Sequence, residues 1–353
     1  MKRSGRKTDH IEIHLNEKTS PNHNHWDDIY LIHHALPEIN KDDIDTSTRL
    51  FGKKLAAPII ISAMTGGFAK AKKINSNLAK AASELEIGFG VGSQRPAIED
   101  PKLRKSYDIV NDYSIPLVIG NLGIPQFIDQ KKGKKVFTVD DAQNAVEMIN
   151  ADILAIHLNY LQELIQPEGD TNAKGSVGVL KKLSRRLPIL AKETGAGISR
   201  DTALALKNAN VKGIDVGGFS GTSFVAIEMH RALKKGDKLR HRLGETFLDW
   251  GLPTPVSVIE ADVGLPIIAT GGIRTGRDIG RALIIHASAA GVAGKLLKPA
   301  TKSAKAVITE LETMIEELRS TMFLINASKV AEIRKKDKLI TGRTAAWLTA
   351  LSN

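Results

Sequence analysis

From residue 57 onward, short apolar runs alternate along the chain with longer stretches in which apolar residues recur at helical spacing. Each apolar run is nearly continuous and is flanked by Gly, Pro or Asn, which is typical of strands covered on both faces of a parallel sheet. The intervening stretches predict helices, among them Ala71–Leu85, Thr138–Ile149, Ser199–Asn208 and Arg277–His286. The pattern predicts eight strands, at Pro58–Ala63, Gly88–Gly92, Leu117–Gly120, Ile153–Leu158, Ile189–Lys192, Gly213–Val216, Pro266–Thr270 and Ala290–Ala293.

Eight strands that alternate with helices favour an α/β fold of the TIM-barrel type, a closed (β/α)₈ barrel. The alternative is an open doubly wound sheet, which typically carries a Gly-x-Gly-x-x-Gly turn between an early strand and its helix. Gly88–Gly92 contains alternating glycines, but Ser93–Pro96 interrupts the chain before any helix begins. We therefore predict one domain over residues 1–353, with an N-terminal arm (1–56), a barrel (57–300) and extra C-terminal helices (301–353).

Composition narrows the functional class. The chain has no cysteine, which excludes disulfides, thiolate metal sites and a cysteine nucleophile, and fits a cytoplasmic location. No apolar run approaches the roughly 20 residues that span a bilayer, so we expect no membrane insertion. The formal net charge is +11, but the basic residues are scattered and lack interleaved aromatic residues, so we expect no nucleic-acid partner. The pairs His23/His25 and His33/His34 lack the spacing of a zinc site, and we interpret them as non-metal.

Polar residues and glycines follow nearly every predicted strand. Turns are rich in Gly and Ser in any protein, which explains one such cluster but not clusters at the same end of almost all eight strands. The carboxyl ends of barrel strands are where active sites form. The sequence therefore predicts a site at this rim, built from 62–67, 93–95, Asn121, 157–159, 192–195, 217–222 and 271–274.

The exits of the last two strands indicate phosphate binding. Gly271 and Gly272 end the seventh strand just before a predicted helix, and Ala293-Gly294 ends the eighth. Glycine allows backbone N–H groups to approach phosphate oxygens, and the helix N-terminus adds partial positive charge. A plain tight turn is the simpler alternative, although barrels frequently bind phosphate between these two loops.

Three further side chains at the rim could act on a ligand. Lys192 ends an apolar strand, where a lysine either extends into solvent or meets a ligand, and its polar neighbours favour a ligand. His157 and Asn159 are two residues apart on a strand and so point to the same side, although a lone histidine is more often a satisfied rim residue. The acidic loop that follows could hold Mg²⁺ through oxygen, with Glu163 as one of several carboxylates.

Together these motifs resemble the FMN-dependent type 2 isopentenyl-diphosphate isomerases along the whole chain. The strand-five lysine and the Gly-Gly-x-Arg turn also occur in unrelated flavin barrels, so the combination with the other motifs carries the resemblance. The matching segments are 6–10, 31–37, 62–67, 92–95, 120–123, 157–163, 166–170, Lys192-Glu193, 226–228, 249–254 and 271–274.

The resemblance implies roles for individual residues. It assigns FMN binding to Ala63, Met64, Thr65, Ser93, Asn121, Lys192, Thr222, Gly271, Gly272, Ile273, Arg274, Ala293 and Gly294, and diphosphate binding to Arg6, Lys7, Ser93, Gln94, Arg95, His157, Asn159 and Gln162. Glu163 is implied as the Mg²⁺ ligand, and Gln162, Glu228 and His157 as the groups that take part in proton transfer. The implied reaction interconverts isopentenyl and dimethylallyl diphosphate in isoprenoid biosynthesis, with FMN kept reduced by NAD(P)H. The family forms tetramers or octamers, so a homo-oligomer is expected.

Two loops depart from the family pattern. Gly217 stands where many relatives have serine, which removes a hydroxyl contact to FMN, and Gly294-Lys295-Leu296 replaces a Leu-Pro-like continuation. The main alternative function is that of an FMN-dependent 2-hydroxy-acid oxidase, which needs a histidine base in the sixth loop. Residues 217–224 contain no histidine. Inosine monophosphate dehydrogenase and dihydrouridine synthase both use a cysteine, which this chain lacks.

Overall fold

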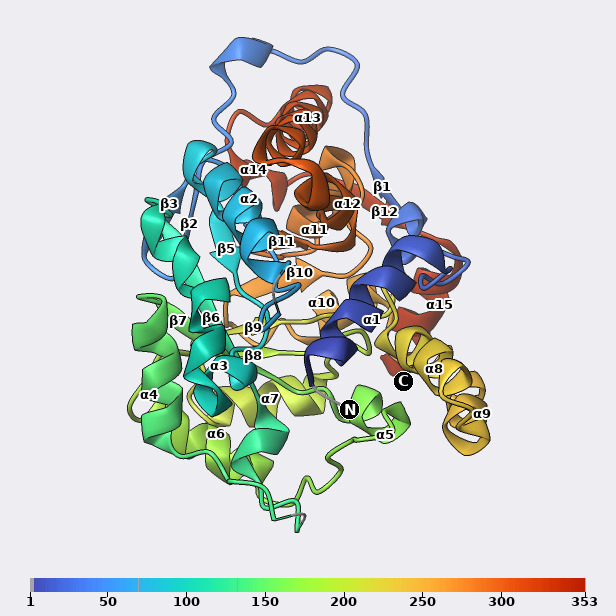
Figure 1. The fold of residues 1–353 in the computed structure, drawn as a ribbon. Coiled ribbons are helices and arrows are strands. Elements are labelled where there is room, and N and C mark those ends of the chain that lie inside the picture. Colours follow the sequence, from blue (N-terminus) through green and yellow to red (C-terminus); the bar gives the residue numbers. More distant parts are fainter. Residues whose placement is uncertain (1–2, 69, 132, 353) are drawn as a thin grey trace.

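A closed barrel of parallel strands forms the centre of the molecule (Figure 1). The computed structural model describes residues 3–68, 70–131 and 133–352, without the side chains of residues 3–6. In this part of the chain the strands of the barrel follow one another in the order β10-β11-β4-β5-β6-β7-β8-β9. Their bounds are β4 Ile59–Ile61, β5 Gly88–Gly90, β6 Leu117–Gly123, β7 Ile153–His157, β8 Ile189–Lys192, β9 Gly213–Asp215, β10 Ile267–Thr270 and β11 Ala289–Val292.

The eight predicted strands are confirmed, each within a few residues of its predicted bounds. Pairing between the last and first barrel strands closes the ring, with Ala290 of β11 opposite Ile59 of β4. On its other side β11 pairs with β10, and β10 pairs with β9. This closure rules out the open doubly wound sheet.

Helices surround the barrel, and several begin at a Ser or Thr that caps the first turn. The side chains of Thr138, Ser199, Ser223 and Thr275 each accept a hydrogen bond from a backbone N–H three residues later. Such capping satisfies donors that would otherwise lack partners and explains where these helices start. The helices are α2 Ala71–Glu84, α3 Arg95–Glu99, α4 Val139–Met148, α5 Tyr160–Ile165, α6 Ser176–Ser184, α7 Arg200–Asn208, α8 Phe224–Lys234, α9 Lys238–Thr246, α10 Thr254–Glu260, α11 Gly276–Ile284, α12 Gly294–Lys302 and α13 Ala304–Leu324, with 3₁₀ turns η3 Pro101–Ser106, η4 Asp108–Asp112 and η5 Ile124–Phe127.

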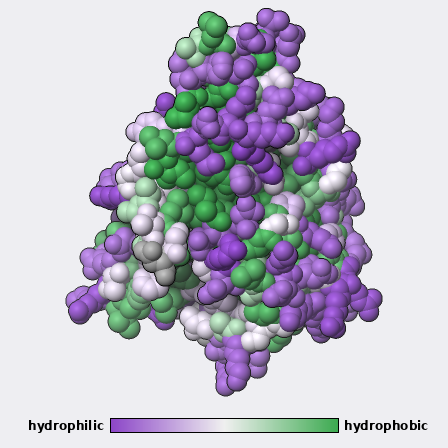
Figure 2. Space-filling view, turned by 180° about the vertical axis from the view of Figure 1, so that it is seen from behind, coloured by the Kyte–Doolittle hydropathy of each residue, from purple (hydrophilic) through white to green (hydrophobic). Residues whose placement is uncertain are grey.

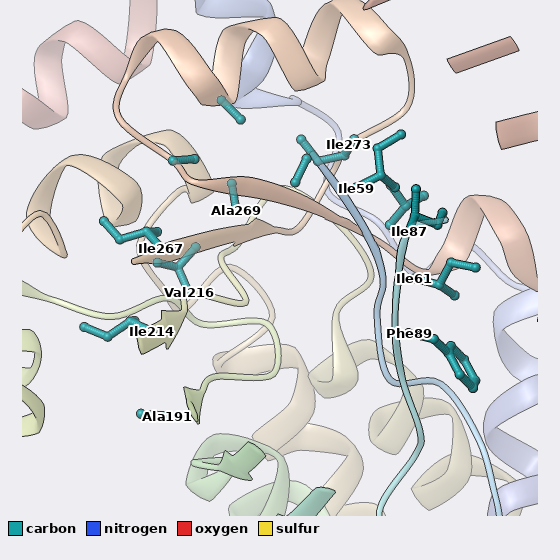
Figure 3. Packing of buried hydrophobic residues seen from close by; sticks show 14 of the residues in the cluster. Ile59, Ile61, Ile87, Phe89, Ala191, Ile214, Val216, Ile267, Ala269 and Ile273 are labelled. Carbon is teal, nitrogen blue, oxygen red and sulfur yellow. The ribbon is translucent and has the colours of Figure 1, made fainter. Parts of the chain in front are cut away.

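Alternate strand residues separate the core into two layers. Ile59, Ile61 and Phe89 belong to the large cluster that joins the outer face of the barrel to the helices (Figure 3). Ile60, which lies between the first two, belongs to a smaller cluster inside the barrel. Leu50 and Leu55 join that inner cluster from the antiparallel pair β2 Thr48–Leu50 and β3 Lys53–Leu55. The interior is therefore filled by side chains, which leaves the carboxyl-end rim for a site.

The segments before and after the barrel pair with each other. In the N-terminal arm, α1 Arg3–Asn16 packs beside α8 (Figure 1), followed by η1 His25–Asp28, β1 Ile29–Leu31 and η2 Lys41–Asp43. β1 pairs antiparallel with β12 Lys338–Ile340, which lies between α14 Val330–Ile333 and α15 Gly342–Leu351. Among the described residues, no helix is both long and apolar enough to cross a membrane. Figure 2 shows hydrophobic residues grouped in the middle of one face of the molecule, between hydrophilic borders.

Candidate functional site

A cavity of about 600 Å³ opens at the carboxyl ends of the barrel strands, and the N-terminal arm forms part of its wall. The arm contributes residues of α1 and of the segment 20–27. The site residues expected from the sequence converge here from almost every strand end, and so the structure brings most of them together. The expected residues that line the cavity are Lys7, Ala63, Met64, Ser93, Arg95, Asn121, His157, Asn159, Gln162, Glu163, Lys192, Thr222, Gly271, Gly272, Ile273, Arg274, Ala293 and Gly294.

The turn after β10 is shaped so that only glycine fits. Gly271 and Gly272 have φ angles of 124° and 78°, a region that residues with a side chain rarely adopt. A Cβ on Gly271 would lie 2.5 Å from the carbonyl oxygen of Gly218, and one on Gly272 would lie 2.3 Å from that of Ser220. The turn leads through Thr275 into the N-terminus of α11, so it provides backbone N–H groups beside a helix end.

Arg274 is already paired within the protein. Its guanidinium donates to both oxygens of Asp27, at 2.9 and 2.6 Å, and to Asp278 at 3.0 Å. The hydrogen bond to Asp27, together with the Asp278 carboxylate, raises the pKa of Arg274. Arg281 also reaches Asp278, at 2.8 Å. This network fixes the side chain of Arg274 against the arm.

At the end of β8, a charged cluster underlies the cavity. Lys192 is buried, with its Nζ 3.0 Å from Oδ2 of Asp215. The other oxygen of Asp215, Oδ1, is buried and has no hydrogen-bond partner among the described residues. Next to Lys192, burial raises the pKa of Glu193 to about 7, although backbone N–H groups of Ala196 and Gly195 donate to its carboxylate. The side chain of Lys192 is thus held in place by the carboxylate of Asp215, and the carboxylate of Glu193 is held by backbone N–H groups.

A close backbone contact in the sixth loop explains why position 217 is a glycine, where the family pattern has serine. Gly217 has a φ angle of 47°, and a Cβ there would lie 2.0 Å from the carbonyl oxygen of Glu193. No side chain fits, so a hydroxyl at this position is sterically excluded. Gly221 approaches the turn after β10 equally closely, because its Cβ would lie 2.5 Å from the backbone nitrogen of Gly272.

Polar side chains from β6, β7 and α5 form the opposite wall. Nδ1 of His157 lies 2.8 Å from Oδ1 of Asn121, which fixes the orientation of the imidazole ring. Nδ2 of Asn159 donates to Oε1 of Glu163 at 2.9 Å, while Oδ1 of Asn159 is buried with no hydrogen-bond partner in the described part of the chain. Arg95 donates to Glu99 at 3.0 Å and to Asp170 at 3.4 Å.

Glu163 is a buried carboxylate whose orientation is fixed by neighbours. Besides Asn159, its Oε2 accepts hydrogen bonds from the side chain of Gln166 at 3.2 Å and from the backbone N–H of Asp170 at 2.8 Å. The side chain is 4% exposed and lines the cavity. Its oxygens and the unpartnered oxygen of Asn159 are hard donors of the kind that Mg²⁺ prefers.

Glu228 lies behind this wall and not on it. The residue is completely buried, and its carboxylate contacts His10 at 2.8 Å, Gln162 at 3.2 Å and the guanidinium of Arg231. Burial alone would raise the pKa of Glu228, but the neighbouring His10 and Arg231 outweigh it and lower that pKa to about 2. Glu228 therefore carries a negative charge and contacts the cavity lining through Gln162 and His10.

Besides Glu228, two residues expected in the site, Gln94 and Thr65, do not line the cavity. The amide of Gln94 is fully buried and bonds the carbonyl of Ala145 and the N–H of Asn121, so it supports the wall from behind. Thr65 is also buried, and its hydroxyl has no partner among the described residues. The side chain of Arg6 lies outside the described part of the structure.

The arm supplies lining residues that the sequence analysis missed. His10 and His14 line the cavity together with Lys7, from one face of α1. His14 lies near Gly294, and burial lowers the pKa of its imidazole. The spacing 7, 10, 14 is that of one helical face, a signal that the polar composition of the arm concealed.

The pair His23/His25 in the arm lies beside Asp28, a neighbour that the spacing of the two histidines did not reveal. Ligand-type atoms of His23, His25 and Asp28 lie within 4.8 Å of one another and could hold a metal ion. These side chains already take part in hydrogen bonds. Nε2 of His23 lies 3.0 Å from Oδ1 of Asp28, the hydroxyl of Thr344 donates to Oδ2 of Asp28 at 2.7 Å, and Nδ1 of His25 lies 3.0 Å from that hydroxyl. These contacts join the arm to α15.

Comparison with known proteins assigns the family. A relative from Thermoplasma volcanium, named isopentenyl-diphosphate delta-isomerase, is 45% identical over 97% of this chain and 98% of its own length. A relative of the same name from Archaeoglobus fulgidus is 43% identical over 99% of each chain. The chain belongs to the isopentenyl-diphosphate delta-isomerase family.

Two further comparisons place this isomerase family member among flavin barrels. The family of FMN-dependent dehydrogenases matches residues 12–100 and 252–340. A solved structure of mandelate oxidase superposes with a TM-score of 0.63 at 16% identity, covering 96% of this chain and 98% of that one. At this low identity the likeness concerns the fold alone. The isomerase relatives, and not the oxidases, are similar to this chain in sequence along its whole length.

Proposed function

We propose that the protein interconverts isopentenyl and dimethylallyl diphosphate in isoprenoid biosynthesis, using bound FMN and Mg²⁺, with NAD(P)H as the reductant for the flavin. The observation that carries the proposal is a cavity whose lining includes two sets of groups suited to anions. One set is the glycine turn at the N-terminus of α11, and the other combines Lys7 and Arg95 with the carboxylate of Glu163. A flavin phosphate and a metal-bound diphosphate require two such sets. Family membership supports the same substrates.

The residues around the glycine turn fit FMN. Gly221, Gly271 and Gly272 lie where the sixth loop meets the turn after β10, and a Cβ on any of them would clash with the backbone of the facing loop. Such a turn of glycines can present backbone N–H groups to a phosphate. The FMN contacts would also include Ser93, Asn121, Lys192, Thr222, Ala293 and Gly294. Bound reduced FMN supplies an electron-rich ring system and exchangeable protons beside the substrate.

The opposite wall fits a diphosphate and its metal ion. Glu163 is held by Asn159, Gln166 and the backbone of Asp170, so its carboxylate can coordinate Mg²⁺ without reorganising. Lys7, Arg95 and His157 also line the cavity, and we infer that they contact diphosphate oxygens directly. Arg6 belongs to this proposal through the family pattern.

Proton transfer is the difficult step, because an isolated alkene is a poor base and develops positive charge when protonated. Gln162 lines the cavity, and its amide is oriented by Asn159 on one side and by Glu228 on the other. Glu228, which is held ionised, adds a fixed negative charge behind Gln162 and favours a cationic transition state. His157 and Gln162 are the groups that we place nearest the substrate, with Glu228 behind them and in contact with His10, which also lines the cavity.

The test is a flavin spectrum combined with an assay on one substrate. Purified protein reconstituted with FMN should have a flavin absorption band and should convert isopentenyl diphosphate only when Mg²⁺ and a reductant are present. Full activity in metal-free, flavin-free protein would contradict the proposal. Oxidation of a 2-hydroxy acid with reduction of the flavin would instead favour the oxidase alternative, which the absence of a histidine in residues 217–224 argues against.

The proposal also includes a homo-oligomer. Leu233, Leu239 and Trp250 are 58%, 67% and 62% exposed, which is unusual for large apolar side chains in one region of a monomer. They lie on or just after α8 and α9, so this face is where we place the contact between copies. Light scattering of the purified protein would give the oligomeric state.

A further inference from the structure

The glycine turn after β10 is held from outside the barrel by the N-terminal arm. The side chain of Asn24 donates to the carbonyl of Gly272 at 2.8 Å, and the indole N–H of Trp26 donates to the carbonyl of Gly271 at 2.8 Å. Trp26 is completely buried, whereas its acceptor Gly271 is half-buried, so the hydrogen bond is partly shielded from water. Both glycine carbonyls of the turn are therefore taken up by residues almost 250 positions earlier in the chain.

These two bonds fix the directions of two N–H groups. A trans peptide is planar, and its N–H points opposite to its carbonyl. Holding the carbonyls of Gly271 and Gly272 toward the arm therefore turns the N–H groups of Gly272 and Ile273 away from it. Among the described residues, neither N–H has a hydrogen-bond acceptor. Two consecutive glycines have little intrinsic preference for this arrangement, so an external restraint is needed to keep it.

The restraining segment is itself anchored on its other side. The carboxylate of Asp28 accepts hydrogen bonds from the backbone N–H of Thr344 at 2.9 Å and from its hydroxyl at 2.7 Å. His25 contacts the same hydroxyl at 3.0 Å. Asp28, His25 and Thr344 are all buried. The segment 24–28 is thus bonded both to the start of α15 and to the glycine turn.

We propose that Asn24 and Trp26 are positioning residues that preorganise the glycine turn for the flavin phosphate, and that they link docking of the arm to flavin binding. The inference rests on the proposed function, because it takes the turn as the FMN phosphate site. The linkage follows from connectivity: the arm that restrains the turn also carries Lys7 and His10 to the opposite wall of the cavity. A ligand that favours the ordered turn must favour the docked arm by the same free energy.

The first test compares FMN affinity between matched variants, using flavin fluorescence on flavin-free protein. Trp26→Phe removes the N–H and keeps most of the ring, and Asn24→Ala removes the other donor. Each is expected to weaken FMN binding roughly tenfold, the effect of about one hydrogen bond. Trp347→Phe repeats the first change on a half-exposed tryptophan of α15, and Asn77→Ala removes a similar bond to the carbonyl of Ala300. Both controls should stay within about twofold of wild type.

The second test measures the linkage by hydrogen exchange. FMN should slow exchange across residues 20–31 in the wild type, and this protection should be lost in Asn24→Ala and Trp26→Phe but kept in the two controls. If Trp26→Phe does not fold, as judged by its thermal midpoint, Asn24→Ala alone decides the question. Unchanged FMN affinity in the folded variants, or equal losses in the controls, would overturn the inference and leave the proposed function intact. A wild-type protein that binds no FMN would instead overturn the proposed function itself.

Discussion

At the scale of single residues, Glu163 offers a change of charge without a change of shape. Glu163→Gln keeps the size of the side chain and its neighbours Asn159 and Gln166. It removes the negative charge of the carboxylate that we propose as the ligand of Mg²⁺. We expect the Mg²⁺ concentration for half-maximal turnover to rise about 10–100-fold, the range seen when a metal's supporting groups are removed. FMN absorbance should not change. Glu84→Gln, on the exposed surface of α2, is the control.

Glu228 should make the protein sensitive to acid. The neighbouring His10 and Arg231 lower its pKa from the ordinary value of 4.5 to about 2 despite burial, so the folded state binds a proton less readily than the unfolded state. The stabilisation is fully present above pH 4.5 and is lost as the pH falls through 4.5 toward about 2. A shift of this size corresponds to a contribution on the order of 3 kcal/mol. We would measure the free energy of unfolding in urea between about pH 3 and about pH 7. Toward acid pH it should fall less steeply for Glu228→Gln than for wild type.

The residues that sequence reasoning found and missed differ in how local their signals are. Lys192 and Asn159 were predicted because each follows an apolar run directly, so their place at the rim depends only on neighbours in the chain. Asn24 and Trp26 were missed because their partners, Gly272 and Gly271, are more than 240 residues away. Gln94 sits beside two rim residues in the chain, but its amide turns inward to bond Ala145. Adjacency in sequence predicts the rim and does not predict the direction of each side chain.

At the scale of elements, the contact between the sixth loop and the turn after β10 leaves no room for a methyl group. A Cβ on Gly221 would lie 2.5 Å from the backbone nitrogen of Gly272, so Gly221→Ala must push the two loops apart. We expect FMN affinity to fall at least about tenfold while the barrel stays folded. The matched control is Gly178→Ala in α6, where nothing lies within 4 Å of the new methyl group. Equal FMN affinity in both variants would show that the two loops do not act together on the flavin.

The strands and helices of the barrel and the C-terminal helices were predictable, whereas the elements of the N-terminal arm and the β1–β12 pair were not. Strands such as β8 are short, continuously apolar and buried, and helices such as α7 begin at a capping residue that the sequence displays. α1 is polar, and β1 and β12 are three residues long with partly exposed patterns. Their structure depends on partners far away in the chain, so local propensity carries little information about them.

At the scale of the whole molecule, the two ends of the chain stabilise each other and the site. β1 pairs with β12, with Ile29 opposite Ile340, and Asp28 bonds Thr344 at the start of α15. These contacts bring the arm behind the glycine turn and over the cavity. The barrel provides the walls of the site, and the paired termini complete it. This explains why the strand pattern predicts the turn that we propose for the phosphate, whereas the outer support of that turn became visible only in three dimensions.

The positive charge of the whole molecule yields the last prediction. The net charge is +11, yet basic side chains are paired with carboxylates on different sides of the fold, for example Lys53 with Asp152 at 2.6 Å and Lys295 with Glu310 at 3.1 Å. A dispersed charge attracts small anions at long range without forming the continuous basic surface that a duplex needs. We therefore expect kcat/KM for the diphosphate to fall as ionic strength rises, with kcat nearly constant.

The same charge should give no stable complex with nucleic acid. Fluorescence anisotropy with a labelled DNA duplex at about 0.15 M salt should show no saturable binding, because screening at that ionic strength limits attraction to about 8 Å. A complex whose affinity falls steeply with salt would instead reveal several phosphate contacts and a basic surface in active use. In that case the excess positive charge would serve a second partner. Adding DNA to the turnover assay would then show whether DNA competes with the diphosphate substrate.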